Sequence, residues 1–450
     1  MGIADFLKDK VSGAPNWLTL PLLHMNRLGP MSFGPSMIRF KKSIPNIDPE
    51  EKLVDMVNYA IRHVPYYRDR YKGLSIRSVS EFENKIGFID KEEVTKHASE
   101  FVSELACKIP HVVRSTAGTT GKPLHMLIPS DRYITEMAFV TGAWERAGWD
   151  YGIRASIRRK VLPQGKDFIV NPATREIIFD GYRTDESYLR KMRDVLKRNG
   201  VTTLYAYTST AFQLLKQFKY YGIDVSFLKL ALLTSEGVND MQKRFIEDEM
   251  GLKISSFYGH TEKLIFIERV DSDTHAIEDA YGFTEIVGAD GLSAKAGESG
   301  ELVGTTFYNR VMPLIRYRTG DYATVTDRRI EIGNRSRRVV SSIEGRREKN
   351  LIYRHDGTTA SATAFEIHDE HVMHVDGLQY VQHKPGYMVV NVIKGANFTD
   401  VDEAFMIQHY GHAMGGTEFV SLNYVDSLVS EPNGKTLTVI NNCNFNRQSK

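Results

Sequence analysis

The order of apolar and amphipathic segments in the middle of the chain restricts the fold more than any other feature. Segments with helical spacing alternate there with short apolar runs. The spacing predicts helices over 49–63, 131–149, 185–198, 210–221 and 241–250, and strands over 201–207, 228–234 and 253–257. Strands that alternate with helices usually form a parallel sheet covered by helices on both faces. Ligands bind such sheets at the carboxyl ends of the strands, where Ser235 and Tyr258 stand in this chain.

The length of 450 residues predicts more than one domain, because a single hydrophobic core rarely organises more than about 250–300 residues. Between residues 280 and 325 the pattern changes to short strands and turns, which favours a small antiparallel barrel or sheet. We therefore expect an α/β fold with a large N-terminal domain over 1–345, made of mixed and parallel sheets with helices and a small β-barrel-like subdomain. A smaller α+β domain is expected over 346–450.

Charge and cysteine content argue against several classes of protein. The chain has 58 basic and 56 acidic side chains, so its formal net charge of +2 gives no overall field that favours nucleic acid. Its two cysteines, Cys107 and Cys443, form neither a disulfide framework nor a cysteine zinc site, which favours the reducing cytoplasm. No stretch approaches the roughly twenty apolar residues of a transmembrane segment. The apolar segment 17–28 is interpreted as an arm packed on the core, with peripheral membrane contact as the alternative.

The segment from Arg114 to Pro123 reads R-S-T-A-G-T-T-G-K-P and has the composition of a phosphate-binding loop. Its glycines let the backbone approach a charged group, its hydroxyls are short donors, and Lys122 adds positive charge. It is not a Walker loop, because Thr116 stands where that motif needs glycine and Pro123 follows the lysine. Apolar residues on both sides predict that the loop joins two strands of a hairpin. A plain surface turn is the alternative.

Five short motifs follow one another in a fixed order. They are S-T-A-G-T-T-G-K-P at 115–123, Y-G-H-T-E at 258–262, Y-R-T-G-D at 317–321, G-R-R-E-K at 345–349 and N-G-K at 433–435. In this order they resemble the adenylate-forming superfamily of acyl-CoA synthetases, peptide-synthetase adenylation domains and luciferases. The segments V-P-Y-Y-R at 64–68 and F-I-D-K-E at 88–92 resemble, within it, the phenylacetate-CoA ligase family and its capsular-polysaccharide-biosynthesis branch. The resemblance spans roughly residues 55–440 and implies a mobile C-terminal lid.

The resemblance implies a site for ATP and Mg²⁺. The residues implied to bind ATP are Ser115, Thr116, Gly118, Thr119, Thr120, Gly121, Glu236, Tyr258, Gly259, Asp321 and Arg346. Asp321 would accept from both ribose hydroxyls, and Glu262 would bind the Mg²⁺ that bridges phosphate oxygens. Without the resemblance, Asp321 reads as a turn aspartate, Tyr258 as a core aromatic and Arg346 as a solvated side chain.

Three further roles follow from the same resemblance. The residues implied to be catalytic are Lys122, Thr261 and Lys435, and Lys349 falls at the hinge about which the small domain would turn. The acyl pocket would be formed by Tyr205, Tyr207, Ser209 and His260, which are more polar than a pocket for an aryl group requires. A polar acid is therefore favoured. The alternatives are a hairpin turn at Lys435 and a His260 that is hydrogen-bonded to the backbone.

The activity that the resemblance implies is ATP-dependent adenylation of a carboxylic acid, with release of pyrophosphate and then acyl transfer to an acceptor. Coenzyme A is the expected acceptor. An amine, on an amino sugar or amino acid in surface polysaccharide biosynthesis, is the alternative. A non-catalytic nucleotide-binding protein of the same fold is a second alternative. The sequence does not identify the acid or the oligomeric state, for which a homodimer is one option.

Overall fold

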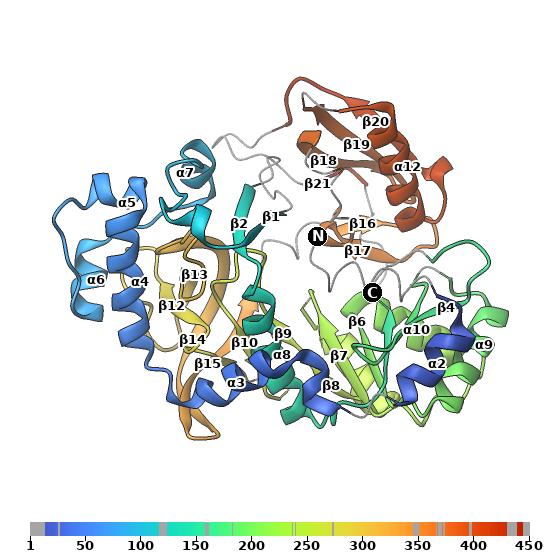
Figure 1. Ribbon diagram of the computed structural model, residues 1–450. Coiled ribbons are helices and arrows are strands. Elements are labelled where there is room, and N and C mark those ends of the chain that lie inside the picture. The colour runs from blue at the N-terminus through green and yellow to red at the C-terminus, as the bar shows by residue number, and fades with distance from the viewer. Residues whose placement is uncertain are drawn as a thin grey trace.

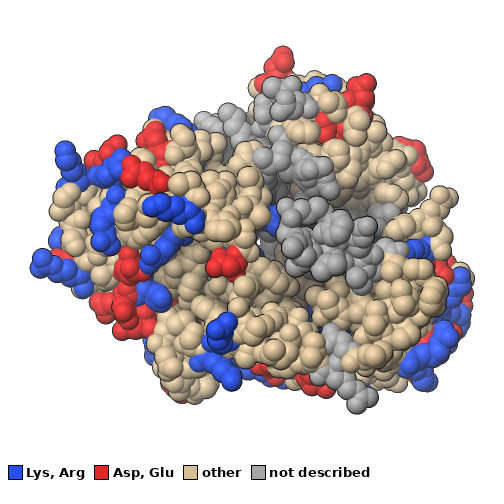
Figure 2. Space-filling view, viewed as in Figure 1, with Lys and Arg blue, Asp and Glu red and all other residues tan. Residues whose placement is uncertain are grey.

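The computed structural model contains two large sheets side by side and a smaller C-terminal unit above them (Figure 1). The residues described are 14–25, 28–116, 124–157, 162–181, 183–235, 237–238, 240–271, 274–344, 351–365, 367, 371, 374–395, 398–429 and 439–443. Acidic and basic side chains are interspersed over the face seen in Figure 2. No helix among the described residues is long and apolar enough to cross a membrane.

The first large sheet confirms the predicted strand–helix alternation. Its six strands lie in the order β4-β5-β3-β6-β7-β8, and all neighbours are parallel except β4 and β5. The strands are β3 Arg154–Ile157, β4 Phe168–Asn171, β5 Glu176–Phe179, β6 Thr203–Tyr207, β7 Leu230–Thr234 and β8 Lys253–Ser255. The helices around it are α8 Arg132–Ala147, α9 Glu186–Arg198 and α10 Thr208–Tyr220.

Successive side chains of β7 pack on opposite faces of this sheet, as strand geometry requires. Leu230 and Leu232 join a core cluster with α8, whereas Ala231 and Leu233 join the cluster that contains α9 and α10. Helix α8 also packs against Tyr281 and Phe266 of the second large sheet region, so it lies between the two sheets. Gly148 ends α8 in the left-handed conformation at φ 108°.

The second large sheet has seven antiparallel strands in the order β12-β13-β14-β15-β11-β10-β9. The strands are β9 Phe257–Tyr258, β10 Ile267–Arg269, β11 His275–Ile277, β12 Gly282–Val287, β13 Ser299–Thr306, β14 Tyr317–Ile332 and β15 Arg335–Glu344. The short strands expected between 280 and 325 are β12, β13 and the first half of β14.

Two predicted elements differ from the structure. The predicted strand 253–257 is divided, because the chain leaves the parallel sheet after Ser255 and enters the antiparallel sheet at Phe257. The Y-G-H-T-E segment therefore follows a strand of the second sheet rather than of the first. The predicted helix 241–250 is a short helix, α11 Asp240–Lys243, that continues as π-helical turns over Arg244–Glu249.

Helices from the N-terminal part of the chain pack against the antiparallel sheet. They are α4 Pro49–His63, α5 Pro65–Arg70, α6 Val79–Lys85 and α7 Lys91–Lys96. Asp48 caps α4 and Asp90 caps α7. Leu53, Met56 and Val57 of α4 pack in one core with residues of the sheet. The predicted hairpin is present as β1 His111–Thr116 and β2 Leu124–Pro129, with Thr116 opposite Leu124.

The N-terminal arm packs on the core by one side only. Helix α2 Asn16–Met25 buries only Thr19 and Leu23, and α3 Pro35–Ser43 packs on α8. Trp17 and Met25 are 76% and 75% exposed. The arm packs on the core of the first sheet near β4 through Leu23 and Leu20, as predicted, while Trp17 and Met25 stay exposed.

The C-terminal unit, residues 351–443, has a core of its own. Its strands are β16 Leu351–Tyr353, β17 Thr359–Ser361, β18 Val375–Lys384, β19 Tyr387–Lys394, β20 Val420–Tyr424 and β21 Val439–Asn441, with helix α12 Asp400–Met414. Strands β20 and β21 lie at opposite edges of the sheet order β20-β19-β18-β21. The stretch between them that contains Lys435 lies outside the described residues.

Candidate active site

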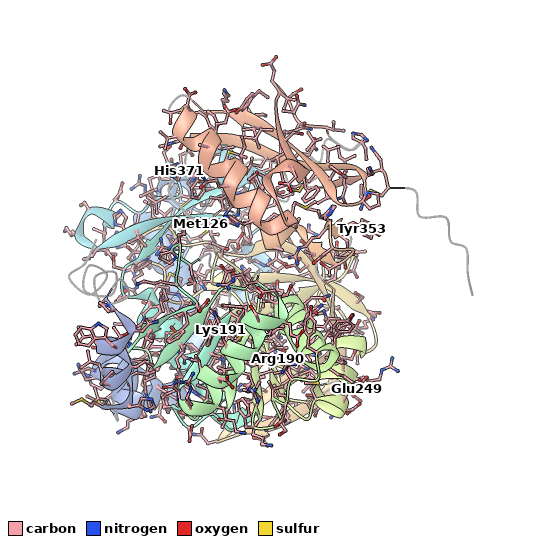
Figure 3. All side chains as sticks on the ribbon, turned by 90° about the vertical axis from the view of Figure 1, so that its right-hand side faces the viewer. Met126, Arg190, Lys191, Glu249, Tyr353 and His371 are labelled. Carbon is pink, nitrogen blue, oxygen red and sulfur yellow. The ribbon has the colours of Figure 1, made fainter. Side chains whose placement is uncertain are left out.

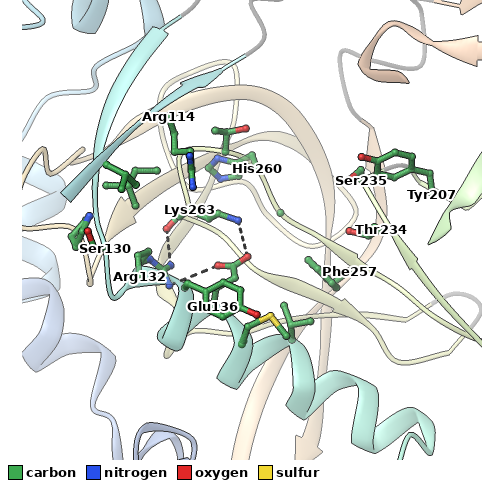
Figure 4. A pocket seen from close by; sticks show the side chains of 18 of the residues that line it. Arg114, Ser130, Arg132, Glu136, Tyr207, Thr234, Ser235, Phe257, His260 and Lys263 are labelled. Atoms are coloured by element: carbon green, nitrogen blue, oxygen red, sulfur yellow. Dashed lines mark hydrogen bonds and ion pairs between the residues drawn. The ribbon is translucent and has the colours of Figure 1, made fainter. Parts of the chain in front are cut away.

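A cavity of about 470 Å³ lies where the two large sheets, helix α8 and the C-terminal unit approach one another (Figure 4). Its lining includes Val112, Arg114, Ile128, Pro129, Ser130, Arg132, Tyr133, Glu136, Met137, Val140, Tyr205, Tyr207, Thr234, Ser235, Phe257, Gly259, His260, Thr261, Lys263 and Ala364. Polar and apolar side chains share this lining. The volume is that of a pocket for a small molecule.

Those predicted site residues that the structure describes lie at this cavity or next to it. Five of them line it, namely Tyr205, Tyr207, Gly259, His260 and Thr261. Glu262 is hydrogen-bonded to the lining residue His260, and Tyr258, which precedes the lining residue Gly259, is hydrogen-bonded to Asp321. The following lie outside the described residues: Gly118, Thr119, Thr120, Gly121, Lys122, Glu236, Arg346, Lys349 and Lys435, together with the side chains of Ser115, Thr116 and Ser209.

Asp321 is placed by an irregularity in strand β14. Glu301 pairs with Tyr322 and Val303 with Arg318, so Leu302 alone stands opposite three residues, 319–321. Gly320 occupies this bulge with φ 73°, a conformation that glycine adopts without strain. Its N–H donates to the Glu301 carboxylate at 2.8 Å.

The Tyr258 hydroxyl donates to Asp321 Oδ2 at 2.8 Å. Burial, followed by the negative charge of Asp321, raises the pKa of Tyr258 well above its usual value. Tyr258 is therefore a stable donor at neutral pH and fixes the orientation of the carboxylate. This contact joins the Y-G-H-T-E segment to the Y-R-T-G-D segment.

The segment before Asp321 is contacted by the V-P-Y-Y-R motif at 64–68 and the F-I-D-K-E motif at 88–92. The Tyr67 hydroxyl donates to the Pro313 carbonyl at 3.2 Å and accepts from Ile315 N–H at 3.0 Å. Ile89 forms a parallel bridge with Tyr317. The V-P-Y-Y-R and F-I-D motifs therefore support the strand that carries Asp321.

His260 and Glu262 form a buried pair at the cavity wall. His260 Nδ1 lies 3.0 Å from Glu262 Oε2, and the side chains are 8% and 14% exposed. Burial raises the pKa of Glu262, but the hydrogen bond and positive charge of His260 outweigh this and lower it to about 2. His260 Nε2 has no hydrogen-bond partner among the described residues. His260 Nδ1 thus meets a carboxylate and not the backbone, which was the alternative for this residue, and the side chain lines the cavity as predicted.

The Glu262 carboxylate suits a hard divalent cation. It is ionised at neutral pH and its Oε1 accepts a hydrogen bond from Tyr317 at 3.3 Å. Mg²⁺ is usually held by one or two carboxylates together with waters and substrate phosphates. A single buried carboxylate beside the wall that bears Thr261 fits that pattern.

A second charged group, Arg132 with Glu136 and Lys263, forms what we term the basic corner of the cavity (Figure 4). Lys263 Nζ lies 2.8 Å from Glu136 Oε1, and Arg132 Nη1 lies 3.7 Å from Glu136 Oε2. The Tyr281 hydroxyl donates to Glu136 at 2.6 Å. Burial raises the pKa of Glu136, but the charges of Lys263 and Arg132 lower it below its usual value. Two cations and one anion leave the corner with a net positive charge.

Two nitrogen atoms of the Arg132 side chain have no hydrogen-bond partner among the described residues. It is 3% exposed and its guanidinium lies over the Tyr281 ring at 4.5 Å. Nη2 donates to the Lys263 carbonyl at 3.2 Å, whereas Nε and Nη1 have no hydrogen-bond partner among the described residues. Unpaired buried donors are costly, and a ligand bound in the cavity is one group that would complete those of Arg132.

Backbone strain is found at two residues of the lining. Ser235, which directly follows β7, has φ 67°, and Lys263, which directly follows Y-G-H-T-E, has φ 59°. Left-handed conformations of residues other than glycine are uncommon and concentrate at functional sites. Ser235 stands at the carboxyl end of β7, where open α/β sheets bind ligands, whereas Lys263 follows a strand of the antiparallel sheet.

Sequence reasoning missed the basic corner. Arg132 and Glu136 are four residues apart at the start of a predicted helix, which is also the spacing of an ordinary surface ion pair. Lys263 stands next to a motif that had been recognised. No periodicity indicates that these three side chains meet.

Comparisons with known proteins bear on the fold of the whole chain. Residues 352–442 match the family described as the CapK C-terminal domain. Protein CapK of Staphylococcus aureus is 22% identical over 410 residues, which cover 87% of this chain and 88% of CapK.

Among solved structures, 2-hydroxyisobutyryl-CoA ligase in complex with 2-HIB-AMP and CoA in its thioesterification state superposes with a TM-score of 0.54. The match covers 92% of this chain and 91% of that chain, at 18% identity. The postadenylation state of the same ligase in complex with R3-HIB-AMP gives a TM-score of 0.52 at 17% identity, with 89% of each chain covered. The resemblance drawn from the motifs is therefore confirmed: the chain is similar to CapK and has the fold of the adenylate-forming acyl-CoA ligases.

Proposed function

We propose that this protein is an ATP-dependent, AMP-forming ligase that activates a carboxylic acid. The observation that carries the proposal is that Thr261 lines the cavity next to the buried His260–Glu262 pair, while Tyr258 of the same segment orients Asp321. In the reaction, a carboxylate oxygen of the acid attacks the α-phosphorus of ATP, and the bond between the α-phosphorus and the bridging oxygen breaks. The products are an acyl-adenylate and pyrophosphate.

Each described residue has a task that its surroundings favour. Asp321, oriented by Tyr258, would accept from the ribose hydroxyls, and Thr261 would donate to the α-phosphate. Glu262 would hold Mg²⁺, which neutralises phosphate charge when bound. Lys435 and Lys122 would add positive charge at the α-phosphate and at the leaving pyrophosphate.

The proposed organisation has the domain division at 345/346. The core cluster of the C-terminal unit includes residues from Ile352 to Val439. Ala364 of this unit lines the cavity, so the unit forms part of its boundary. Rotation about Lys349 would change that boundary between adenylation and acyl transfer.

The proposed acid carries a second polar or anionic group. Arg132 and Lys263 outnumber Glu136 at the basic corner, and Arg132 offers two unused donors. His260 Nε2 offers a third polar contact at the same cavity. An acid with an apolar body would leave these groups unpaired, and a site built for hydrogen bonds discriminates strongly against such a substrate.

Coenzyme A is the proposed acceptor, because the solved ligase of the same fold binds CoA in its thioesterification state. An amine acceptor is the second candidate. The similarity to CapK, together with the match to the CapK C-terminal domain, favours a relative of the capsular branch over a general acyl-CoA synthetase. The non-catalytic alternative is disfavoured, since Thr261, Glu262 and Asp321 are all present.

The test is exchange of labelled pyrophosphate into ATP with a panel of aryl, fatty, amino and sugar acids and no acceptor. Exchange with one acid establishes adenylation, after which CoA and amino sugars can be compared as acceptors. Asp321→Ala should weaken ATP binding, whereas Lys435→Ala should reduce exchange and leave ATP binding largely intact. Unchanged ATP affinity in Asp321→Ala would remove that residue from the ribose site, and silence across the panel with ATP still bound would favour the non-catalytic alternative.

A further inference from the structure

Two histidines converge on one carboxylate oxygen in the C-terminal unit. His371 Nδ1 lies 2.6 Å and His374 Nδ1 lies 2.9 Å from Asp402 Oδ1. One possible ligand atom from each of the three residues lies within 4.8 Å of the other two. Asp402 stands in the first turn of α12, and Figure 3 shows His371 in the same C-terminal unit, above Lys191 and Glu249.

The second oxygen of Asp402 is fixed by the start of helix α12. Oδ2 accepts hydrogen bonds from Thr399 N–H at 2.7 Å and from Thr399 Oγ1 at 2.8 Å, which forms a capping box. The His371 ring stacks on Phe405 of the same helix at 4.3 Å. One carboxylate oxygen is therefore held by the helix while the other is presented to two imidazole nitrogens. Supporting bonds of this kind orient ligands in metal sites.

The negative charge of the Asp402 carboxylate is buried and would be stabilised by a nearby positive charge. Its side chain is 2% exposed, and no lysine or arginine among the described residues pairs with it. The two imidazoles compensate this buried charge only when they are protonated, and when they are neutral the cost of burying it remains. A cation at this point removes that cost.

We propose that His371 Nδ1, His374 Nδ1 and Asp402 Oδ1 bind a divalent cation of the zinc class. Imidazole nitrogen and carboxylate oxygen are the ligands that Zn²⁺ accepts alongside cysteine, and three protein ligands leave one position for water. Both imidazoles ligate in the neutral form with the proton on Nε2. This site belongs to the C-terminal unit and does not depend on the proposed ligase activity.

The geometry requires only a small adjustment. Ligand atoms of a tetrahedral zinc site with bonds of about 2.0–2.1 Å are about 3.3 Å apart, so each Nδ1 must move away from Oδ1 by roughly half an ångström. The histidine side chains are 21% and 36% exposed, which leaves room for outward movement. Asp402 itself can stay in place. The bound ion would connect the histidines to the first turn of α12.

The experiment uses the full chain without an affinity tag, stripped of metal and titrated with Zn²⁺ against a chromophoric chelator. We expect one zinc per chain with an affinity in the micromolar range or tighter, and a higher melting temperature in the presence of the ion. Co²⁺ in place of Zn²⁺ should give visible absorption bands of a four-coordinate site. Absence of stoichiometric zinc binding would overturn the proposal.

Variants locate the site. His374→Gln and Asp402→Asn should each weaken zinc binding at least tenfold and remove the Co²⁺ bands, whereas His412→Gln, an exposed histidine of the same helix, should bind as the unaltered chain does. Asp402→Asn also alters the helix cap, so His374→Gln is the decisive variant if the former does not fold. Zinc affinity that is unchanged in His374→Gln would overturn the assignment.

Discussion

Two buried arginines, Arg316 and Arg132, differ in how completely the protein uses them. Arg316 Nε lies 3.1 Å from both oxygens of Glu285, Nη2 lies 2.7 Å from Oε1, and Nη1 donates to the carbonyls of Ile86 and Glu83. Arg132 makes one hydrogen bond, to the Lys263 carbonyl, and has two donors without partners among the described residues. Burial is similar in the two, at 6% and 3% exposure.

We interpret Arg316 as a residue that stabilises the fold and Arg132 as a residue that can contact the ligand. Arg316 stands in the recognisable P-L-I-R-Y-R-T-G-D segment, yet its bonds are all internal and serve to hold the strand that leads to Asp321. Arg132 belongs to no recognised motif, yet it lines the cavity with unused donors. A motif residue can thus be structural while a residue outside any motif meets the ligand.

The largest expected effect is on stability, from Arg316→Ala. Removal of one partner of a buried ion pair leaves Glu285 charged and unpaired, which typically costs about 3–5 kcal/mol of unfolding free energy. Urea denaturation at neutral pH measures this loss. A loss below about 1 kcal/mol would mean that Arg316 is not part of the scaffold.

Arg132→Met should affect ligand recognition more than folding. Glu136 keeps Lys263 and Tyr281 as partners, so the unfolding free energy should fall by about 1 kcal/mol. Hydrogen bonds to charged groups contribute about 1.5–3 kcal/mol, so kcat/KM for the acid should fall about tenfold to a hundredfold. Steady-state kinetics with acid and ATP varied separately measure this. A rise in KM for ATP alone would place Arg132 at the phosphates instead.

The His260–Glu262 pair predicts a pH effect of intermediate size. The pKa of Glu262 is lowered to about 2, so its ionised form stabilises the folded state above its usual pKa of 4.5. That contribution is lost as the pH falls from about 4.5 through about 2. Glu262→Gln should therefore lose less stability over this interval than the unaltered chain, as measured by urea denaturation at several pH values. Equal slopes in the two proteins would contradict the assignment.

The smallest effect is expected from Arg310→Ala, the matched control for the buried arginines. Arg310 pairs with Asp55, and the two side chains are 46% and 48% exposed. Exposed pairs contribute about 0.2–1 kcal/mol, so the unfolding free energy should fall by no more than about 1 kcal/mol. A loss as large as that of Arg316→Ala would show that burial does not decide the difference between them.

Local elements were predictable from the sequence because their signals lie within a few residues. Helix α4 has the predicted bounds Pro49–His63, Asp90 caps α7, and Gly148 ends α8. The hairpin around the phosphate-loop segment and the parallel sheet were likewise predictable from apolar spacing. These features depend on periodicity and capping, which act between near neighbours.

The parts that sequence reasoning missed depend on contacts between distant segments. The chain leaves the parallel sheet after β8 and enters the antiparallel sheet at β9, with only Ser256 between them. The continuous apolar run over these residues does not indicate this change of sheet. Arg132 meets Lys263, and His371 meets Asp402, across 131 and 31 positions of the chain. Such meetings follow from the packing of whole elements, so no local pattern encodes them.

The central claim is that the cavity activates an acid whose second polar group meets the basic corner. It is tested most directly by pyrophosphate exchange into ATP with a dicarboxylic acid and the monocarboxylic acid of equal length, in the unaltered chain and in Arg132→Met. The account predicts faster exchange with the dicarboxylic acid, and at least a tenfold loss of that advantage in the variant. Equal exchange with both acids in the unaltered chain, or an advantage that survives in Arg132→Met, would contradict it.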